Sequence, residues 1–148
     1  MATTEMNLED ALESALSAWI LDSTTHGITI GMPVRHEEQD SSDILTAPCV
    51  ILKATREEED PPLSGCWRLK VEVKMLVQAD DTANATLTAN WHNLMSILIR
   101  DDLASQLSSK VTNFRAYAVR YTGGTERDEQ ERHWLNRMDF QAWAIAAD

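Results

Sequence analysis

The chain has 148 residues and a mass of 16.6 kDa, a length typical of one soluble domain with its own hydrophobic core. Its 13 lysines and arginines against 24 aspartates and glutamates give a formal net charge of −11. This balance argues against a general nucleic-acid binder and against attraction to an anionic membrane. No run approaches the roughly 18 apolar residues of a membrane-spanning helix, and the start of the chain is acidic where a signal peptide would be basic.

The acidic excess is concentrated early in the chain. Residues 1–60 carry thirteen acidic and three basic side chains, whereas residues 61–148 carry eleven and ten. Two polar segments, 35–43 and 57–65, are predicted to be loops because they are rich in charge, proline or serine. Their acidic residues are Glu37, Glu38, Asp40, Asp43, Glu57, Glu58, Glu59 and Asp60.

The two cysteines lie in strand-like runs and are predicted to be free thiols. A hairpin through loop 57–65 would place Cys49 opposite Val73 and Arg56 opposite Cys66. The two sulfurs would then be roughly 20 Å apart at strand rise, well beyond the reach of a disulfide.

The opening helix has the clearest periodicity. Apolar residues recur at helical spacing from residue 8 to residue 20, Asn7 is a suitable N-cap, and the helix is expected to end near Asp22. A short strand or extended arm over 27–34, ended by Pro33, and a buried strand over 47–55 follow.

The strand 66–78 alternates strictly, with apolar residues on one face and Arg68, Lys70 and Lys74 on the other. A helix with an apolar stripe follows residues 80–82, and a short helix follows residues 101–102. The rest is predicted to be a strand over 114–121, a glycine turn at residues 123 and 124 within a charged linker over 122–131, and a last strand over 132–146.

This order predicts a single α+β domain over residues 1–148. We expect an antiparallel or mixed sheet of about four to five strands, with the N-terminal helix and a long central helix packed on one face. The other sheet face would carry the basic side chains, so it is either solvated or covered by a partner.

No arrangement of residues predicts catalysis, and the chain is not expected to be an enzyme. There is no glycine-rich phosphate loop and no nucleophile, zinc or deaminase motif. The triplet from His36 to Glu38 is a weak metal candidate because it lacks a second anchored pair of ligands. We therefore assign no catalytic residue, no cofactor-binding residue and no metal ligand.

The two unlike sheet faces predict an interaction surface instead. Trp134 and Trp143 fall on opposite faces of the last strand, so one of them lies off the core side, where an aromatic residue suits an interface. The candidate interface residues are Arg68, Lys70, Lys74, Trp134 and Trp143.

The succession of segments resembles the tail terminators of tailed bacteriophages, also called tail-completion or minor tail proteins, with head–tail neck proteins close behind. The resemblance is carried by the opening helix LEDALESALSAWIL, the pair APCVILKATREE and GCWRLKVEVKMLVQADD, the helix TANATLTANWHNLMSILIRDDL, and the closing strand RHWLNRMDFQAWA. It covers most of the chain and is architectural, with no catalytic signature.

The resemblance implies a virion subunit, made in the host cytoplasm, that forms a ring, commonly of six copies, on the head-proximal end of the tail tube. Its partners would be further copies of itself, the tail tube protein and a neck or stopper protein. DNA would pass through the ring without specific binding, and the acidic residues of 37–43 and 57–60 would line the channel or rim and repel it.

Two other interpretations stay open at this point. A head–tail connector, either stopper or adaptor, differs from a terminator only in the partners that it touches. A small ligand-binding or enzymatic α+β domain belongs to another class, and it would need a pocket with converging polar groups.

Overall fold

In a computed structural model, the chain forms one sheet with four helices in the part that is described. The structure describes residues 7–36, 49–59, 61–62, 64–78, 83–130 and 133–146, with the side chains of all of these except 78, 83–87, 125–130 and 133–134. In chain order the elements are α1 (Leu8–Ile20), α2 (Ser23–His26), β1 (Val34–His36), β2 (Cys49–Glu59), β3 (Trp67–Gln78), α3 (Ala83–Leu98), α4 (Leu103–Ser108), β4 (Phe114–Gln130) and β5 (His133–Ala146).

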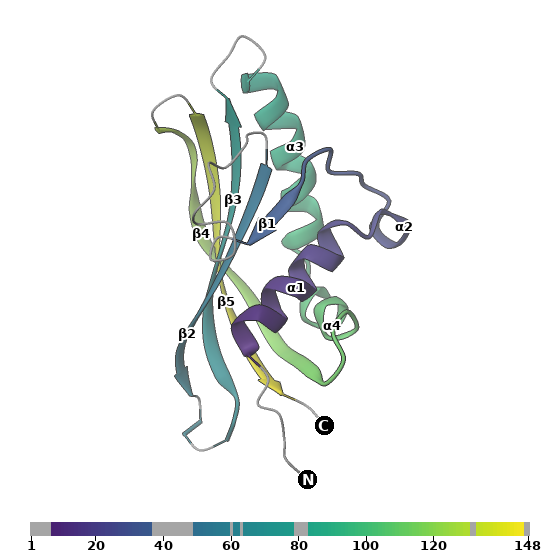
Figure 1. Cartoon of the computed structure of the whole chain (residues 1–148), viewed down its shortest axis with the longest axis vertical. Coiled ribbons are helices and arrows are strands. Elements are labelled where there is room, and N and C mark those ends of the chain that lie inside the picture. The colour runs from purple at the N-terminus through teal and green to yellow at the C-terminus, as the bar shows by residue number, and fades with distance from the viewer. Residues whose placement is uncertain are drawn as a thin grey trace.

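The described sheet is mixed and has five strands in the order β1-β2-β3-β5-β4. Strand β1 runs parallel to β2, and every other pair is antiparallel. The helices gather on one side of the sheet (Figure 1). The predicted α+β class, the mixed sheet and the N-terminal helix are therefore confirmed.

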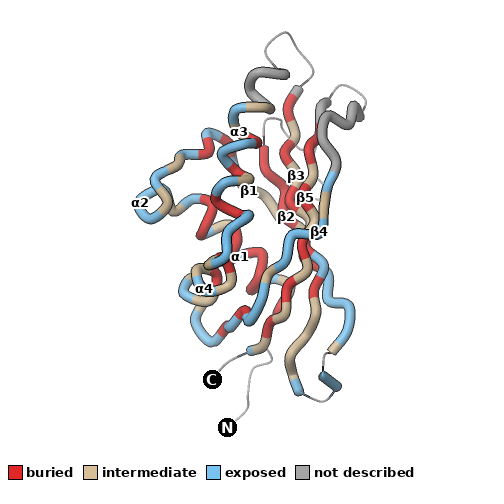
Figure 2. Tube along the Cα trace, turned by 180° about the vertical axis from the view of Figure 1, so that it is seen from behind, coloured by how far each residue is buried: buried red, intermediate tan, exposed pale blue. Residues whose placement is uncertain are grey.

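The core lies between this helix layer and the sheet. The apolar stripe of α1 is buried as predicted, and it packs with Trp91 and Leu94 of α3 and with the helix-facing side chains of the strands. In β3 these are Leu69, Val71, Val73, Met75 and Val77, all at most 3% exposed. Figure 2 shows the buried stretches running along the strands and along the inner side of α1.

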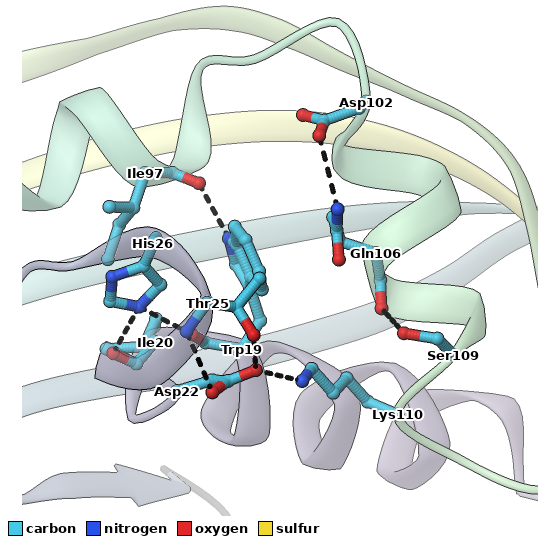
Figure 3. Close-up of polar contacts among 10 residues, drawn as sticks. All are labelled: Trp19, Ile20, Asp22, Thr25, His26, Ile97, Asp102, Gln106, Ser109 and Lys110. Atoms are coloured by element: carbon cyan, nitrogen blue, oxygen red, sulfur yellow. Dashed lines mark hydrogen bonds and ion pairs between the residues drawn. The ribbon is translucent and has the colours of Figure 1, made fainter.

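Helix α1 begins and ends on specific side-chain contacts. The Asn7 side chain accepts a hydrogen bond from the Asp10 backbone N–H at 3.1 Å, which confirms the predicted N-cap. At the other end the His26 ring lies 2.9 Å from the carbonyl oxygen of Trp19 and 3.1 Å from that of Ile20 (Figure 3). Carbonyls of the last helical turn lack partners within the helix. That of Trp19 also accepts a hydrogen bond from the Asp22 N–H at 3.1 Å, and the His26 ring adds a contact to both carbonyls at the end of α1.

The Trp19 indole joins α1 to α3. Its ring is fully buried, and its Nε1–H donates to the Ile97 carbonyl oxygen at 2.7 Å (Figure 3). The Arg100 guanidinium lies 5.1 Å from the centre of the same ring. One side chain thereby fixes the spacing of the two helices over the sheet.

The predicted loop 57–65 begins too early in the sequence. Strand β2 continues through Glu59, with a bulge between Arg56 and Glu58. Cys49 consequently pairs with Leu76 rather than Val73. The bulge lets acidic residues stay on the ladder while the strand bends, which a strict two-residue period does not reveal. The prediction of free thiols is nevertheless confirmed, with Cys49 buried and Cys66 half-buried.

The predicted charged linker over 122–131 is also wrong, because β4 runs without interruption from Phe114 to Gln130. Gly123 and Gly124 lie inside this strand rather than in a turn. Gly123 has a φ of 131°, and a Cβ at Gly124 would overlap the carbonyl oxygen of Arg137. The two glycines allow close strand pairing next to a bulge, which is why they resemble a turn in the sequence.

The early strand lies later than predicted. Residues 27–33 are not part of the sheet, and β1 starts at Val34, beyond the proline that was expected to end it. The Pro33 carbonyl oxygen accepts a hydrogen bond from the Val50 N–H at 2.9 Å, so it begins the parallel pairing with β2. Residues 35–36 of the predicted loop 35–43 thus belong to β1, and residues 37–43 lie outside the described residues.

Candidate functional site

The side of the sheet away from the helices is the candidate site, and we call it the open face. Residues directly opposite each other in antiparallel strands share a face. Leu69 pairs with Ala142 on the helix side, so the neighbouring pair of Lys70 and Gln141 faces the other way. No helix among the described elements covers the open face (Figure 1).

Basic side chains dominate the open face. Among the residues whose side chains the structure describes, the open face holds eight basic residues against four acidic ones, which gives a formal charge of +4 on a chain whose total is −11. The basic residues are Arg35, Lys53, Arg68, Lys70, Lys74, Arg115, Arg120 and Arg137. The acidic residues are Glu57, Glu58, Glu72 and Asp139.

The centre of the open face is a row of ion pairs. Glu72 lies between Lys70 at 3.5 Å and Lys74 at 3.6 Å, and on the next strand Arg137 Nε lies 3.2 Å from Asp139 Oδ1. These side chains range from 20% to 53% exposed, so solvent screens the pairs and each stabilises the fold only weakly.

This centre also contains buried polar atoms whose hydrogen-bonding capacity is not used. Among the described residues, Arg68 Nε, Arg137 Nε and Asp139 Oδ1 are buried and have no hydrogen-bond partner, although each lies within ion-pair distance of an opposite charge. Buried donors and acceptors in native proteins are nearly always satisfied. Arg137 Nε and Asp139 Oδ1 lie 3.2 Å from each other, so their own ion pair accounts for two of these atoms, and none of the three is accessible to a second molecule.

Aromatic side chains lie at the end of the open face where β4 begins. Trp143 is half-buried and sits opposite Arg68 on one side and Ala118 on the other. Tyr117, at the adjoining bulge, is 57% exposed, and the Arg115 guanidinium lies 5.7 Å from its ring centre. Tyrosine, tryptophan and arginine side chains that are at least partly accessible are together typical of protein interfaces.

Four of the five predicted interface residues share this surface, namely Arg68, Lys70, Lys74 and Trp143. Trp134 pairs with Val77, in the register row of the helix side. Its side chain lies outside the described residues, so its predicted part in an interface stays a prediction.

The structure describes only three of the eight predicted rim acids. Glu57 and Glu58 are exposed and lie 3.9 Å and 3.2 Å from the Arg68 guanidinium, whereas Glu59 accepts a hydrogen bond from the Gly65 N–H. The three therefore belong to the end of the β2–β3 pair. The others, Glu37, Glu38, Asp40, Asp43 and Asp60, lie outside the described residues.

Sequence reasoning assigned Trp143 of β5 to the candidate interface, but it missed the charged residues of β5 and the contribution of β4. Arg137 and Asp139 lie on the polar side of the period-two pattern, which could have identified them. Arg115, Tyr117 and Arg120 were hidden because bulges at Ala116/Ala118 and Tyr121/Gly123 interrupt the alternation.

The helix side carries the opposite charge. Seven acidic and three basic side chains on α1, α2, α4, their flanking turns and the end of β2 leave −4. The acidic ones are Glu9, Asp10, Glu13, Asp22, Glu59, Asp101 and Asp102, and the basic ones are Arg56, Arg100 and Lys110.

Two of these acids are held ionised by their neighbours. Hydrogen bonds from Lys110 and then from Thr25 lower the pKa of Asp22 from 3.8 to about 2 (Figure 3). Hydrogen bonds from Arg100 and then from Gln106 lower the pKa of Asp102. The negative charge of the helix side therefore persists well below neutral pH.

A pocket of about 280 Å³ lies at the outer edge of β4, against the turn between α3 and α4. Apolar Ile99 and Tyr121 are 41% and 40% exposed, and they share its lining with Arg100, Asp101 and Arg120. The pocket is small compared with typical ligand sites, which span about 300–1,000 Å³.

Within the described ranges, no three His, Cys, Asp or Glu side chains are grouped as a metal site would require. The described helices include none that is long and apolar enough to span a membrane. No protein-family model matches the chain, and no curated protein matches it.

Proposed function

We propose that this chain is a structural subunit of a tailed-bacteriophage virion. Copies of it form a ring, commonly of six, at the head-proximal end of the tail tube. The ring stops tube polymerisation and provides the docking surface for the neck of the filled head. Its partners are its own copies, the tail tube protein and a neck or stopper protein.

The observation that carries this proposal is the open face. A sheet with helices on one side and a broad, charged, aromatic-edged surface on the other suits a subunit with a neighbour on each side. The segments that carry the resemblance also occur as elements of one domain, namely α1, the β2–β3 pair, α3 after β3, and β5 as the last strand.

Deletion of the gene from the phage that carries it tests the proposal. Loss of a terminator leaves tube polymerisation unchecked, so electron microscopy should show abnormally long tails detached from heads. Supplying the intact gene from a plasmid should restore normal tails. Tails of normal length in the deletion strain would contradict the proposal.

A head–tail connector is the alternative within the same class, and the same experiment separates the two. A connector seals the filled head, so its loss should give normal tails beside heads that leak DNA. The surface used for self-association would be similar in a terminator and in a connector. The deletion phenotype, and not the fold, therefore distinguishes the two.

Passage of DNA through the ring gives the acidic segments a role in this proposal. Acidic side chains at the rim would repel the phosphate backbone and prevent it from sticking. Replacing Glu37, Glu38, Asp40 and Asp43 by their amides should slow DNA ejection without blocking assembly. Unchanged ejection would remove this role.

The pocket beside β4 favours a second candidate, a small-ligand-binding domain. Arg100 and Arg120 would suit an anionic group, and Ile99 and Tyr121 an apolar one. A screen of small carboxylates and phosphates by thermal shift tests it. A ligand that raises the melting temperature of the wild-type protein but not that of Tyr121→Ala would support this candidate.

A further inference from the structure

The two sides of the sheet carry opposite charge in the described part of the chain. The open face has +4 and the helix side has −4. The electrostatic attraction between such surfaces favours the approach of one copy with its open face toward the helix side of another, and like surfaces repel. Charge therefore favours a contact between two different surfaces, the open face of one copy and the helix side of the next.

The exposed basic side chains of the open face, Lys70 and Arg115 among them, indicate the kind of group that it accepts. Ammonium and guanidinium groups only donate hydrogen bonds, so a partner has to supply acceptors. Carboxylates are the strongest acceptors that a protein partner can offer to a guanidinium. The helix side offers two exposed carboxylates, Asp10 and Asp101, for which the structure shows no salt bridge.

The edge of the sheet is a poor alternative contact. Strand β4 is an edge strand of 17 residues in the described sheet, but bulges interrupt its register at Ala116/Ala118, Tyr121/Gly123 and Thr125/Asp128. Bulges on an edge strand twist it and obstruct the addition of another strand. Copies of the chain are therefore more easily joined through faces than through edges.

We propose that the open face of one copy docks on the helix side of the next copy. Trp143 and Tyr117 form the apolar centre of the contact, and the bases around them, Lys70 and Arg115 among them, face Asp10 and Asp101 of the neighbour. The two surfaces differ, so the contact is heterologous, and repeating it gives a closed ring when the rotation between copies closes.

This inference rests on the proposed ring and assigns the two surfaces that join its subunits. A charge exchange tests it in the purified full-length protein. One variant carries Lys70→Glu with Arg115→Glu, which reverses the charge at two contact positions and lowers the formal charge of the open face from +4 to 0. A second carries Asp10→Lys with Asp101→Lys, which reverses the charge at the two facing positions and raises the formal charge of the helix side from −4 to 0. A third carries all four changes and keeps the net charge at −11.

Sedimentation velocity and native mass spectrometry measure the assembly. Wild type should self-associate, and each two-residue variant alone should associate at least about tenfold more weakly, because like charges then meet across the contact. The four-residue variant should recover association, and so should an equimolar mixture of the two-residue variants, in alternating order. Both two-residue variants stay net acidic, so recovery on mixing cannot come from their overall charge.

All four changed positions are exposed, and circular dichroism checks that each variant is folded. If the two introduced glutamates prevent folding, Lys70→Gln with Arg115→Gln still has to weaken association. A wild type that stays monomeric, two-residue variants that associate normally, or a mixture that does not recover would each overturn the inference. So would an open face that binds a single-stranded DNA oligonucleotide while the copies remain monomers.

The two proposals can fail separately. If the deletion strain makes tails of normal length but the charge exchange recovers association, the function is wrong and the contact stands. If tails become long but the exchange does not recover association, the ring is joined through other surfaces.

Discussion

At the scale of single residues, Glu13 is a buried acid with a defined structural role. Its side chain is 4% exposed, and its two oxygens lie 2.9 Å from His36 Nδ1 and 2.9 Å from the Ala54 backbone nitrogen. In the described part of β1, pairing with β2 ends at His36 and Leu52. The Glu13 carboxylate accepts the hydrogen bond of the Ala54 N–H beyond that point and binds α1 to the described β1–β2 pair.

We expect Glu13→Ala to lower the free energy of unfolding by about 2–4 kcal/mol, because a buried backbone donor loses its acceptor and a cavity remains. Glu13→Gln should lose less, since its amide oxygen can still accept. Urea unfolding measures both, with the exposed neighbour Ser14→Ala as the control. An alanine variant as stable as this control would show that Glu13 has no such role.

Asp22 provides a pH-dependent prediction. Its pKa in the folded protein is about 2, below the ordinary value of 3.8, because Lys110 and Thr25 donate hydrogen bonds to the carboxylate. The ionised form therefore stabilises the fold above pH 3.8, and this contribution is lost as the pH falls toward 2.

The melting temperature of Asp22→Asn should accordingly be below that of wild type at neutral pH, and the difference should disappear near pH 2. Asparagine keeps the N-cap of α2, so the comparison isolates the charge. Thermal unfolding at a series of pH values measures this, with Asp101→Asn as the control. A difference that persists at the lowest pH would exclude the ionic origin.

At the scale of elements, strand β4 depends on close contact with β5 near its glycines. A Cβ at Gly124 would overlap the Arg137 carbonyl oxygen, whereas a Cβ at Gly31, in the segment before β1, meets nothing within 4 Å. The pairing of β4 with β5 beyond Thr122 therefore needs glycine at position 124. Position 31 lies outside this pairing and has room for a larger side chain.

Gly124→Ala should lower the free energy of unfolding by about 1–3 kcal/mol, because the strands must separate to admit the methyl group. Gly31→Ala is the matched control and should be neutral or slightly stabilising. Amide hydrogen exchange would localise the loss of protection in Gly124→Ala to the paired ends of β4 and β5. Equal stability of the two variants would mean that β4 and β5 can separate at Gly124 without loss of stability.

At the scale of the whole molecule, the unequal distribution of charge between the two faces matters more than the total. The proposed contact joins exposed charges, which salt screens over a Debye length of about 10 Å at 0.1 M ionic strength. Association of wild-type copies should weaken steadily from about 0.05 M to about 0.5 M NaCl. Sedimentation velocity measures the effect, and association that strengthens with salt would indicate a contact dominated by apolar side chains.

Local patterns in the sequence were sufficient for much of this molecule. The stripe of α1, its Asn7 cap and the strict alternation of β3 follow from the geometry of single helices and strands. They therefore also identified the α+β class and the grouping of Arg68, Lys70 and Lys74 on one face. Each of these features depends on residues that are near one another in the chain.

Only the tertiary structure decided where β2 ends, how far β4 runs and which strands flank β3. Bulges at Arg56/Glu58 and along β4 change the two-residue period, and glycines that look like a turn lie inside a paired strand. Whether these residues belong to a strand depends on pairing partners that are distant in the chain. No short window of sequence therefore predicts the strand ends. The same long-range pairing places Trp143 of β5 opposite Arg68 of β3 and Arg115 of β4 opposite Ile145 of β5, and this creates the open face.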